Sequence, residues 1–514
     1  MKIHANYNNK TKEELLHILV KQETQIDSLA KQIQILEEYV LAHKLRQFAN
    51  KSEKFSRDQI SLFDEAQLPK NPENIITAEE EIQVASHNRT KSGRRPLPKE
   101  LPRVQRVYDL AEHEKICQCG CALTHITDEK SEQLEIIQPK IYVIEHIKKK
   151  YACKSCEETI KTATMPPLPI PRSIAASGLL SHVLISKFQD HLPLFRQEQI
   201  LKRVGVDIPR STLSLWTIKS AALFTPLLKL IHDNIINYDV AYGDETTIQV
   251  IKEPSKGITS KKYMWVFSGG PPDKFAFYYQ YHPSRSHEVP LSFFADFKGY
   301  LHCDGFTAYD TLASVNKNIT LVGCLYHARR KFAEVIKITK SKEGVAVDVV
   351  KYIAKLATIE EEIKNKVPGE KYQLRNEKAK PMLDELKGYL ISNQPSVPPK
   401  SLLGQAISYT LNQFPKLISY LKDERLENNN NRSERAIKPF VIGRKGWLFA
   451  HSVEGAHAAA TIFSLIETCK YHQVEPYDYF RYVLNKIPLC TTLDELEALL
   501  PYNINQKLLT IIHD

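Results

Sequence analysis

The stretch that decides the fold is VAYGDETTIQV, residues 240–250. Its β-branched and aromatic residues predict a β-strand, in which alternate side chains face the same way. Val240, Tyr242, Asp244, Ile248 and Val250 are then expected on one face. Asp244 stands there among apolar side chains, where an unpaired charge is costly. A nearby cation would remove that cost.

Further β-type runs follow this stretch, at residues 262–267, 275–279, 300–304 and 319–322, with a helix-like run at residues 286–297. The turn-rich segment between the second and third runs predicts an antiparallel meander. Three strands, a helix and a fourth strand are the order of a ribonuclease-H-like domain, in which the first and fourth strands lie side by side. We therefore expect Asp244 to lie close to Asp304, at the end of the fourth strand.

Two aspartates on adjacent strands, with a glutamate from a later helix, are what two hard divalent cations need. Such a pair of ions supports phosphodiester hydrolysis and strand transfer. Glu434 is the favoured glutamate, because Asn430 and Asn431 precede it at helical spacing and flank it on one face. The alternatives are arginine partners for the aspartates and a surface pair of Glu434 with Lys438. Pro439 is expected to end or kink this helix.

Composition favours a multidomain α+β protein with a polyanionic partner. The chain has 514 residues, and 70 Lys and Arg against 60 Asp and Glu give a net charge of +10. The alternative is a merely basic soluble protein. No apolar run approaches the roughly 18 residues that span a bilayer, and the first residues lack the apolar core of a signal peptide. We expect a cytoplasmic protein without a membrane partner.

Residues 1–50 predict a coiled-coil leucine zipper. Leu19, Ile26, Ile33 and Val40 occupy one position of a heptad, and the other holds Leu15, Leu29 and Leu36 with Gln22 as its polar member. This pattern favours a parallel homodimer; a helix packed on its own chain is the alternative. Residues 51–105 form a basic linker, in which Arg94 and Arg95 are candidates for binding DNA phosphates, unless the linker is simply solvated.

Residues 106–165 predict a small zinc-ribbon-like domain with one bound Zn²⁺. Of the nine cysteines in the chain, five fall in two clusters, and a strand-like run at residues 141–147 lies between the clusters. Tetrahedral zinc takes four thiolates, and the ion supplies the folding free energy that so small a core lacks. We expect four of these five cysteines as ligands: Cys117, Cys119, Cys121, Cys153 and Cys156. Three surface thiols without a metal are the alternative.

The rest of the chain divides into a helical region and a catalytic core. Residues 172–232 predict helices, with a helix-turn-helix at residues 196–216, a turn at Gly205 and a cap at Ser211 or Thr212. Ordinary core helices are the alternative, because Leu213, Leu215 and Trp216 look buried. The core covers residues 236–327 and 428–485, separated by a helical insertion at residues 328–427 and followed by a helical tail at residues 486–514.

Cys324 and His327 form a Cys-x-x-His motif just after the fifth strand. Two ligands do not fill a tetrahedral metal site. We therefore expect a structural or DNA-positioning role for this pair, with the adjacent basic run binding phosphates near the scissile bond. A third metal site is the alternative.

Five motifs together resemble those of the insertion-sequence-66 family of bacterial DDE transposases. They are GDET at 243–246, CDGFTAY at 303–309, GCLYHARRKF at 323–332, NNRSERAIKP at 430–439 and GRKGWLF at 443–449. The resemblance implies a ribonuclease-H-like core in which Asp244, Asp304 and Glu434 bind Mg²⁺, two ions in each active site. The residues expected to bind DNA are Arg94, Arg95, Arg329, Arg330, Lys331, Arg435, Arg444 and Lys445.

The predicted function is metal-dependent DNA cleavage and strand transfer at the ends of the protein's own insertion sequence. The expected partners are double-stranded DNA, as terminal inverted repeats and as target, and a second copy of the chain; accessory proteins of the same element are candidates. The alternatives are a ribonuclease-H-like nuclease without strand transfer and a non-catalytic, zinc-containing DNA-binding protein.

Overall fold

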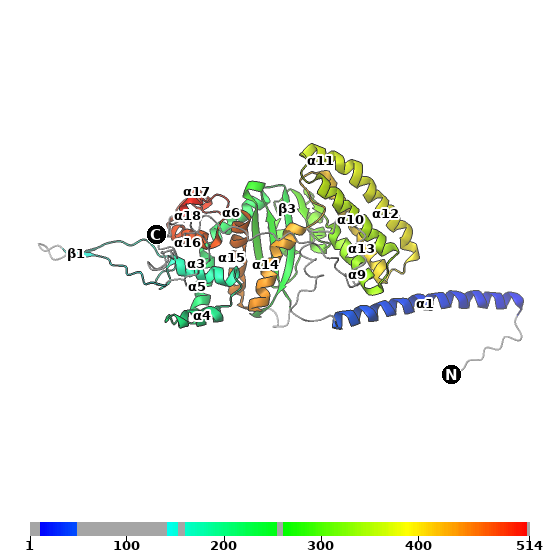
Figure 1. Cartoon of the computed structure of the whole chain (residues 1–514), viewed down its shortest axis with the longest axis horizontal. Helices are drawn as coiled ribbons and strands as arrows, with labels where there is room; N and C mark the ends of the chain where they lie inside the picture. The colour runs from blue at the N-terminus through cyan, green and yellow to red at the C-terminus, as the bar shows by residue number, and fades with distance from the viewer. Residues whose placement is uncertain (1–10, 49–140, 153–159, 254–260, 511–514) are drawn as a thin grey trace, which may run out of the picture. The chain divides into compact units, whose positions relative to one another are not determined.

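The computed structural model describes residues 11–48, 141–152, 160–253 and 261–510. The chain divides into two compact units, one formed by residues 1–77 and 166–514 and the other by residues 78–165. The larger unit combines a mixed sheet with helices, which agrees with the predicted α+β class. Figure 1 shows that this sheet, labelled at β3, lies between two groups of helices.

The central sheet has five strands in the order β6-β5-β3-β7-β8. Their bounds are β3 Val240–Ile248, β5 Lys262–Gly269, β6 Ala276–His282, β7 Gly299–His302 and β8 Ile319–Val322. β3 pairs antiparallel with β5 and β5 with β6, whereas β7 is parallel to both β3 and β8. The first and fourth strands of the sheet are therefore neighbours, as the sequence predicted.

The run at residues 240–250 does not form one strand of the central sheet. Its buried residues belong to two clusters, one with Val240 and Tyr242 and the other with Ile248 and Val250. The expectation that Val250 continues the face of β3 is wrong, because the chain leaves the central sheet after Ile248. Its next strand, β4 (Val250–Lys252), pairs in parallel with β9 (Ala450–Ser452).

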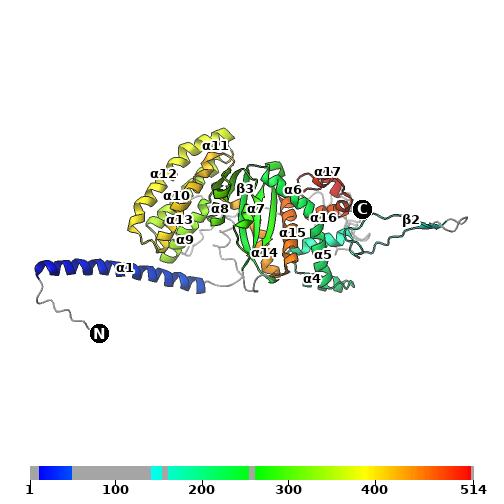
Figure 2. The ribbon, with the colours of Figure 1, turned by 180° about the vertical axis from the view of Figure 1, so that it is seen from behind.

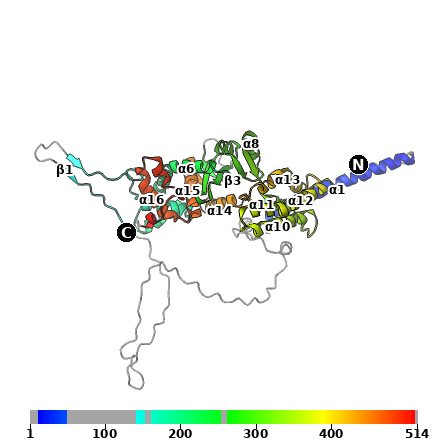
Figure 3. The same ribbon diagram turned by 90° about the horizontal axis from the view of Figure 1, so that it is seen from above.

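The two buried clusters contain different helices. One includes residues of α3 (Ser177–Phe188), α5 (Arg210–Leu223), α6 (Thr225–Ile236), α15 (Val453–Tyr471) and α16 (Pro476–Lys486). The other contains residues of α9 (Leu325–Thr339), α10 (Val345–Ile363), α12 (Lys380–Asn393) and α13 (Leu402–Leu417). Figure 2 and Figure 3 show these two groups on opposite sides of β3.

The helix-turn-helix segment forms two helices, α4 (Leu194–Arg203) and α5, with Gly205 at φ 84° between them. The predicted cap is wrong: α5 begins at Arg210, after Pro209, whose fixed φ suits the turn that precedes a helix. Leu215 is also 48% exposed, although Leu213 and Trp216 are buried. Because α5 packs on α15, its buried face belongs to the core.

The helix that carries Glu434 is α14, Asn431–Trp447, and it continues through Pro439. The expectation that this proline ends the helix is wrong. Proline removes one backbone donor, but Ala436, Ile437 and Phe440 are buried around it and hold the helix against the core. The chain ends in α16 and the short helices α17 (Leu493–Glu497) and α18 (Lys507–Thr510).

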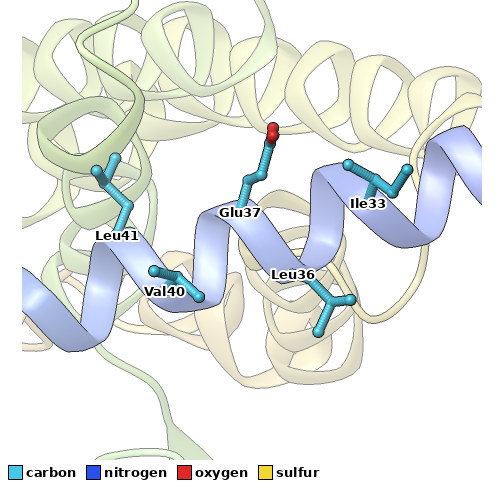
Figure 4. A pocket seen from close by; sticks show the side chains of 5 residues that line it. All are labelled: Ile33, Leu36, Glu37, Val40 and Leu41. Carbon is cyan, nitrogen blue, oxygen red and sulfur yellow. The ribbon is translucent and has the colours of Figure 1, made fainter.

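The N-terminal helix, α1, runs without a break from Lys12 to Phe48. Its heptad residues are exposed, with values from 52% to 65% for Leu19, Ile26, Leu29, Ile33, Leu36 and Val40. A hydrogen bond ties it to the insertion, where the backbone N–H of Leu402 donates to Glu38 at 3.2 Å. Figure 4 shows a shallow pocket on this helix, lined by Ile33, Leu36, Glu37, Val40 and Leu41.

The described part of the smaller unit is an antiparallel hairpin of β1 (Lys150–Ala152) and β2 (Ile160–Thr162). Residues 141–147 are not a strand, so this prediction is wrong; the strand begins at Lys150, where a partner provides backbone hydrogen bonds. The five candidate zinc ligands lie outside the described residues, but Cys153 directly follows β1. Within the described ranges, no helix is long and apolar enough to cross a membrane.

The insertion is organised around a buried arginine, Arg375, on the π-helical turn η4 (Arg375–Ala379). Its guanidinium pairs with Glu360 at 2.7 Å. It also donates to the carbonyl oxygens of Tyr420, Asp423 and Leu426. This side chain, 1% exposed, therefore joins the helical insertion to the segment that leads into α14.

We expect Arg375→Met to destabilise the insertion by about 3–5 kcal/mol, because it leaves Glu360 and three carbonyl groups without their partner. Hydrogen exchange of residues 402–426 should accelerate roughly 100-fold. The matched control is Lys378→Met, which breaks an exposed pair with Glu362 and should cost less than about 1 kcal/mol. Equal exchange in both variants would contradict this role for Arg375.

Candidate active site

The pairing of β3 with β7 brings two aspartates to one end of the sheet. Tyr242 is opposite His302 in the parallel register, and Asp244 and Asp304 each follow two residues later. Backbone N–H groups fix both carboxylates: Glu245 donates to Asp244 at 2.8 Å, and Phe306 donates to Asp304 at 2.9 Å. Both aspartates are half-buried.

Glu434 reaches the same place from the first turn of α14. Asn430, the N-cap, donates its side-chain amide to the carbonyl oxygen of Gly243 at 3.3 Å, and its own carbonyl accepts from the N–H of Glu434. The start of α14 is thereby attached to β3 directly beside Asp244. The carboxylate of Glu434 is 12% exposed.

Burial and neighbouring charges raise the pKa of two carboxylates in this site. Burial raises the pKa of Asp244 well above its usual range, and the charges of Glu245, Asp304 and Glu434 raise it further. Burial also raises the pKa of Glu434, with a contribution from Asp304 and against the opposing effect of Arg330. Shifts in this direction are expected for carboxylates that lie close together in a poorly solvated place.

Two arginines accompany the carboxylates. Arg285 hydrogen-bonds Glu245, stacks over the ring of Phe306 at 3.8 Å and approaches Asp304 at 3.8 Å. Arg330 approaches Glu434 at 3.6 Å. The sequence analysis missed Glu245, whose pKa burial raises to about 7, and its partner Arg285. The Glu245 carboxylate is only 3% exposed, so this pair fixes the loop before α7 (Glu288–Phe293) beside Asp304.

Gly243 is packed so closely that a side chain at this position would clash with its neighbour. A Cβ atom there would lie 2.8 Å from the hydroxyl oxygen of Tyr309. Tyr309 belongs to α8 (Thr307–Val315), the helix that directly follows the Asp304 turn. The glycine of GDET thus lets β3 and α8 approach each other, which brings the two aspartates into one site.

The predicted DNA-binding residues differ in exposure. Lys331, Arg435 and Lys445 are exposed on α9 and α14, the two helices that begin at the site. Arg444 is half-buried and hydrogen-bonds Thr247 on β3, so it holds α14 to the sheet. Arg329 and Arg330 are half-buried beside the site. Arg94 and Arg95 lie outside the described residues.

The Cys-x-x-His motif also reaches this site. Cys324 is the N-cap of α9, His327 lies in its first turn, and Nδ1 of His327 is 3.8 Å from Oε1 of Glu434. The backbone N–H of Asn430 donates to Sγ of Cys324 at 3.3 Å. The sequence predicted a structural or DNA-positioning role for this pair but could not show that it adjoins Glu434.

Comparison with known proteins identifies the family of this chain. The pattern of the family described as "Transposase IS66 family" matches residues 172–458, more than half of the chain. The chain belongs to the IS66 transposase family. Further matches are the "IS66 C-terminal element" at residues 464–502, the "zinc-finger binding domain of transposase IS66" at 114–157 and the "Transposase C of IS166 homeodomain" at 35–106.

Relatives with the same extent occur in Sinorhizobium fredii. The uncharacterized protein y4jD is 33% identical over 79% of this chain and 81% of its own length. The uncharacterized protein y4qI is 30% identical over 82% of this chain and 80% of its own. The IS66 match supports DNA as the partner, and the zinc-finger match supports a bound Zn²⁺ at residues 114–157.

We expect Mg²⁺ to stabilise the protein in a pH-dependent way. The raised pKa values of Asp244, Glu245 and Glu434 mean that the folded protein keeps protons that the unfolded chain loses above about pH 4. Without metal, this stability is present at low pH and is lost as the pH rises through the folded pKa values, about 7 for Glu245. A divalent cation relieves the repulsion only once the carboxylates are ionised.

Thermal unfolding checks this expectation. A Mg²⁺ concentration of about 100 times the Kd at pH 8 should raise Tm by about 5 °C at that pH. The same concentration should raise Tm by little at pH 5. Asp244→Asn should remove the increase, whereas Asp273→Asn, an exposed aspartate before β6, should keep it. The expectation fails if the increase is the same at both pH values or survives in Asp244→Asn.

Proposed function

We propose that this protein catalyses metal-dependent cleavage of DNA and strand transfer at the ends of its own insertion sequence. The observation that carries the proposal is the convergence of Asp244, Asp304 and Glu434: the pairing of β3 with β7 brings the two aspartates together, and the hydrogen bond from Asn430 to Gly243 attaches the start of α14 beside Asp244. Three carboxylates crowded in a half-buried site are unfavourable without cations, so their arrangement favours a site for hard metal ions. Membership of the IS66 transposase family supplies the biological context.

The order of the sheet supports a ribonuclease-H-like core. Three antiparallel strands are followed by two parallel ones; Asp244 lies on the first strand of this sheet in chain order, and Asp304 lies two residues after the end of the fourth. Two Mg²⁺ ions bound by these carboxylates would activate the attacking oxygen and stabilise the leaving oxygen at phosphorus.

The protein's own side chains position the DNA. Lys331, Arg435 and Lys445 are exposed on the two helices that start at the site, where their charges can bind the backbone phosphates. Arg285 and Arg330 face the carboxylates in the free protein. With metal ions bound by these carboxylates, both guanidinium groups would be available to the phosphates of the bound strand.

The test of the proposal is a reaction with DNA that carries the terminal inverted repeats of the element and a separate target. Joined product is expected for a transposase. Cleavage without joining would support the alternative of a ribonuclease-H-like nuclease. Binding without either reaction would support a non-catalytic, zinc-containing DNA-binding protein.

We expect Glu434→Gln to abolish Mg²⁺-dependent cleavage, because an amide cannot replace a charged ligand of a hard cation. The reduction should be at least about 100-fold, while circular dichroism and binding to terminal DNA stay unchanged. Glu427→Gln is the matched control, since Glu427 lies seven residues earlier and pairs with Arg432 at 2.8 Å. Cleavage by Glu434→Gln near the wild-type rate would mean that the third carboxylate is another residue.

Helix α1 is proposed to form a parallel coiled coil with a second copy of the chain. Its described heptad residues are more than half exposed, and they recur along most of the helix. A dimer would bury this stripe and would hold two catalytic units together, so that both ends of the element are bound in one complex.

Ile26→Glu with Ile33→Glu should convert this dimer to a monomer in sedimentation experiments, because four like charges would then face one another across the seam. Val20→Glu with Leu41→Glu is the control. These residues are also exposed on α1 but lie outside the seam, and their replacement should leave the dimer intact. An unchanged sedimentation coefficient for the seam variant would place assembly elsewhere.

A further inference from the structure

A group of three potential metal ligands lies beside the proposed catalytic carboxylates. Sγ of Cys324, a ring nitrogen of His327 and a carboxylate oxygen of Glu434 all lie within 4.8 Å of one another. The first two come from the start of α9 and the third from the start of α14. These ligands are 110 residues apart in the chain at most, so only the folded core brings them together.

Backbone hydrogen bonds hold the two helix starts in place. The N–H of Leu325 donates to the carbonyl oxygen of Asn428 at 3.0 Å. The N–H of Asn430 donates to Sγ of Cys324 at 3.3 Å, which orients the thiol toward α14. The three ligands are therefore positioned by the backbone of both helices, as a metal site requires.

We propose that Cys324, His327 and Glu434 bind a borderline-soft divalent cation of the Zn²⁺ type. Thiolate and imidazole ligands favour zinc over magnesium, and three protein ligands leave a fourth position open. Zinc bonds of about 2.0–2.3 Å place tetrahedral ligand atoms roughly 3.3–3.7 Å apart. A small rotation of the side chains brings the observed group to that size, and the thiol releases its proton on binding.

Unsatisfied polar atoms at the centre of the group support a bound cation. Nδ1 of His327 and Oε1 of Glu434 are both buried, and within the described residues neither has a hydrogen-bond partner. They face each other at 3.8 Å, too far for a hydrogen bond. A cation between them would satisfy both. Arg330, whose side chain is 37% exposed, lies 3.6 Å from the same oxygen of Glu434 and would turn away when a cation binds there.

This ion would differ from the proposed catalytic ions in ligand type and in role. Only Glu434 is shared, and a carboxylate has two oxygens with which to bridge two cations. A zinc ion fixed by Cys324 and His327 would orient Glu434 toward Asp244 and Asp304, so the cysteine and histidine would be positioning residues. The zinc site does not depend on the proposed reaction, because its presence is read from bound metal rather than from cleavage.

The test is the zinc content of the purified full chain, measured by elemental analysis after dialysis. Two equivalents per chain are expected, one in the zinc-finger segment at residues 114–157 and one in this site. Cys324→Ser and His327→Gln should each retain one equivalent, a twofold loss. Cys469→Ser, which changes a buried free cysteine of α15 outside the group, should retain both.

A second measurement separates loss of the ligand from loss of the fold. Co²⁺ exchanged into the wild-type protein should give a thiolate charge-transfer absorption, and Cys324→Ser should lower its intensity while His327→Gln shifts its visible bands. Circular dichroism of His327→Gln should match the wild type. One zinc equivalent in the wild type, or two equivalents in both ligand variants, would overturn the proposal whatever the cleavage assay shows.

Discussion

The architecture of this protein depends on keeping negative charges together in a poorly solvated place. Asp244, Glu245, Asp304 and Glu434 interact strongly enough that burial and mutual repulsion raise the pKa values of Asp244, Glu245 and Glu434. Such repulsion would push the carboxylates apart if the elements that carry them could move. These carboxylates are instead held by β3, by the turn after β7 and by α14, so the crowding cannot relax without unpairing the sheet or detaching α14.

Rigidity comes from backbone contacts rather than from charge. The register of β3 with β7 sets the two aspartates, Asn430 ties α14 to Gly243, and the tight contact of Gly243 with Tyr309 lets α8 approach the sheet. Arg285 and Arg330 then offset part of the charge. The proposed metal ions would take over this role of the two arginines without a change in the backbone that holds the carboxylates.

The sequence predicted the parts of this frame that follow from local pattern. Alternation and turn residues gave the five strands, and their order gave the contact between the first and fourth strands. Local pattern could not predict the residue at which β3 ends, because the pairing of β4 with β9 depends on a segment 200 residues away. It also could not show that α14 continues through Pro439, since burial of the surrounding residues outweighs one lost hydrogen bond.

Pairs that form only in the folded chain were missed for the same reason. Glu245 lies next to Asp244, yet its partner Arg285 is 40 residues away in a loop without periodicity. Cys324 and His327 were recognisable as a motif, but their third neighbour, Glu434, follows the whole insertion. Sequence spacing can group candidate ligands that lie on one helix. It cannot group candidate ligands that come from two helices far apart in the chain.

The insertion that separates these helices is part of the site's support. Lys416 of α13 pairs with Asp310 at 2.6 Å, and its carbonyl oxygen accepts from the N–H of Gly323, just before Cys324. Tyr409 of the same helix packs against Gly305, next to Asp304. Arg375 holds the segment that enters α14. Because the insertion contacts the surroundings of Asp304, Cys324 and Glu434, a displacement of its helices would move all three groups together, and a partner bound to the insertion would act directly on the geometry of the carboxylates.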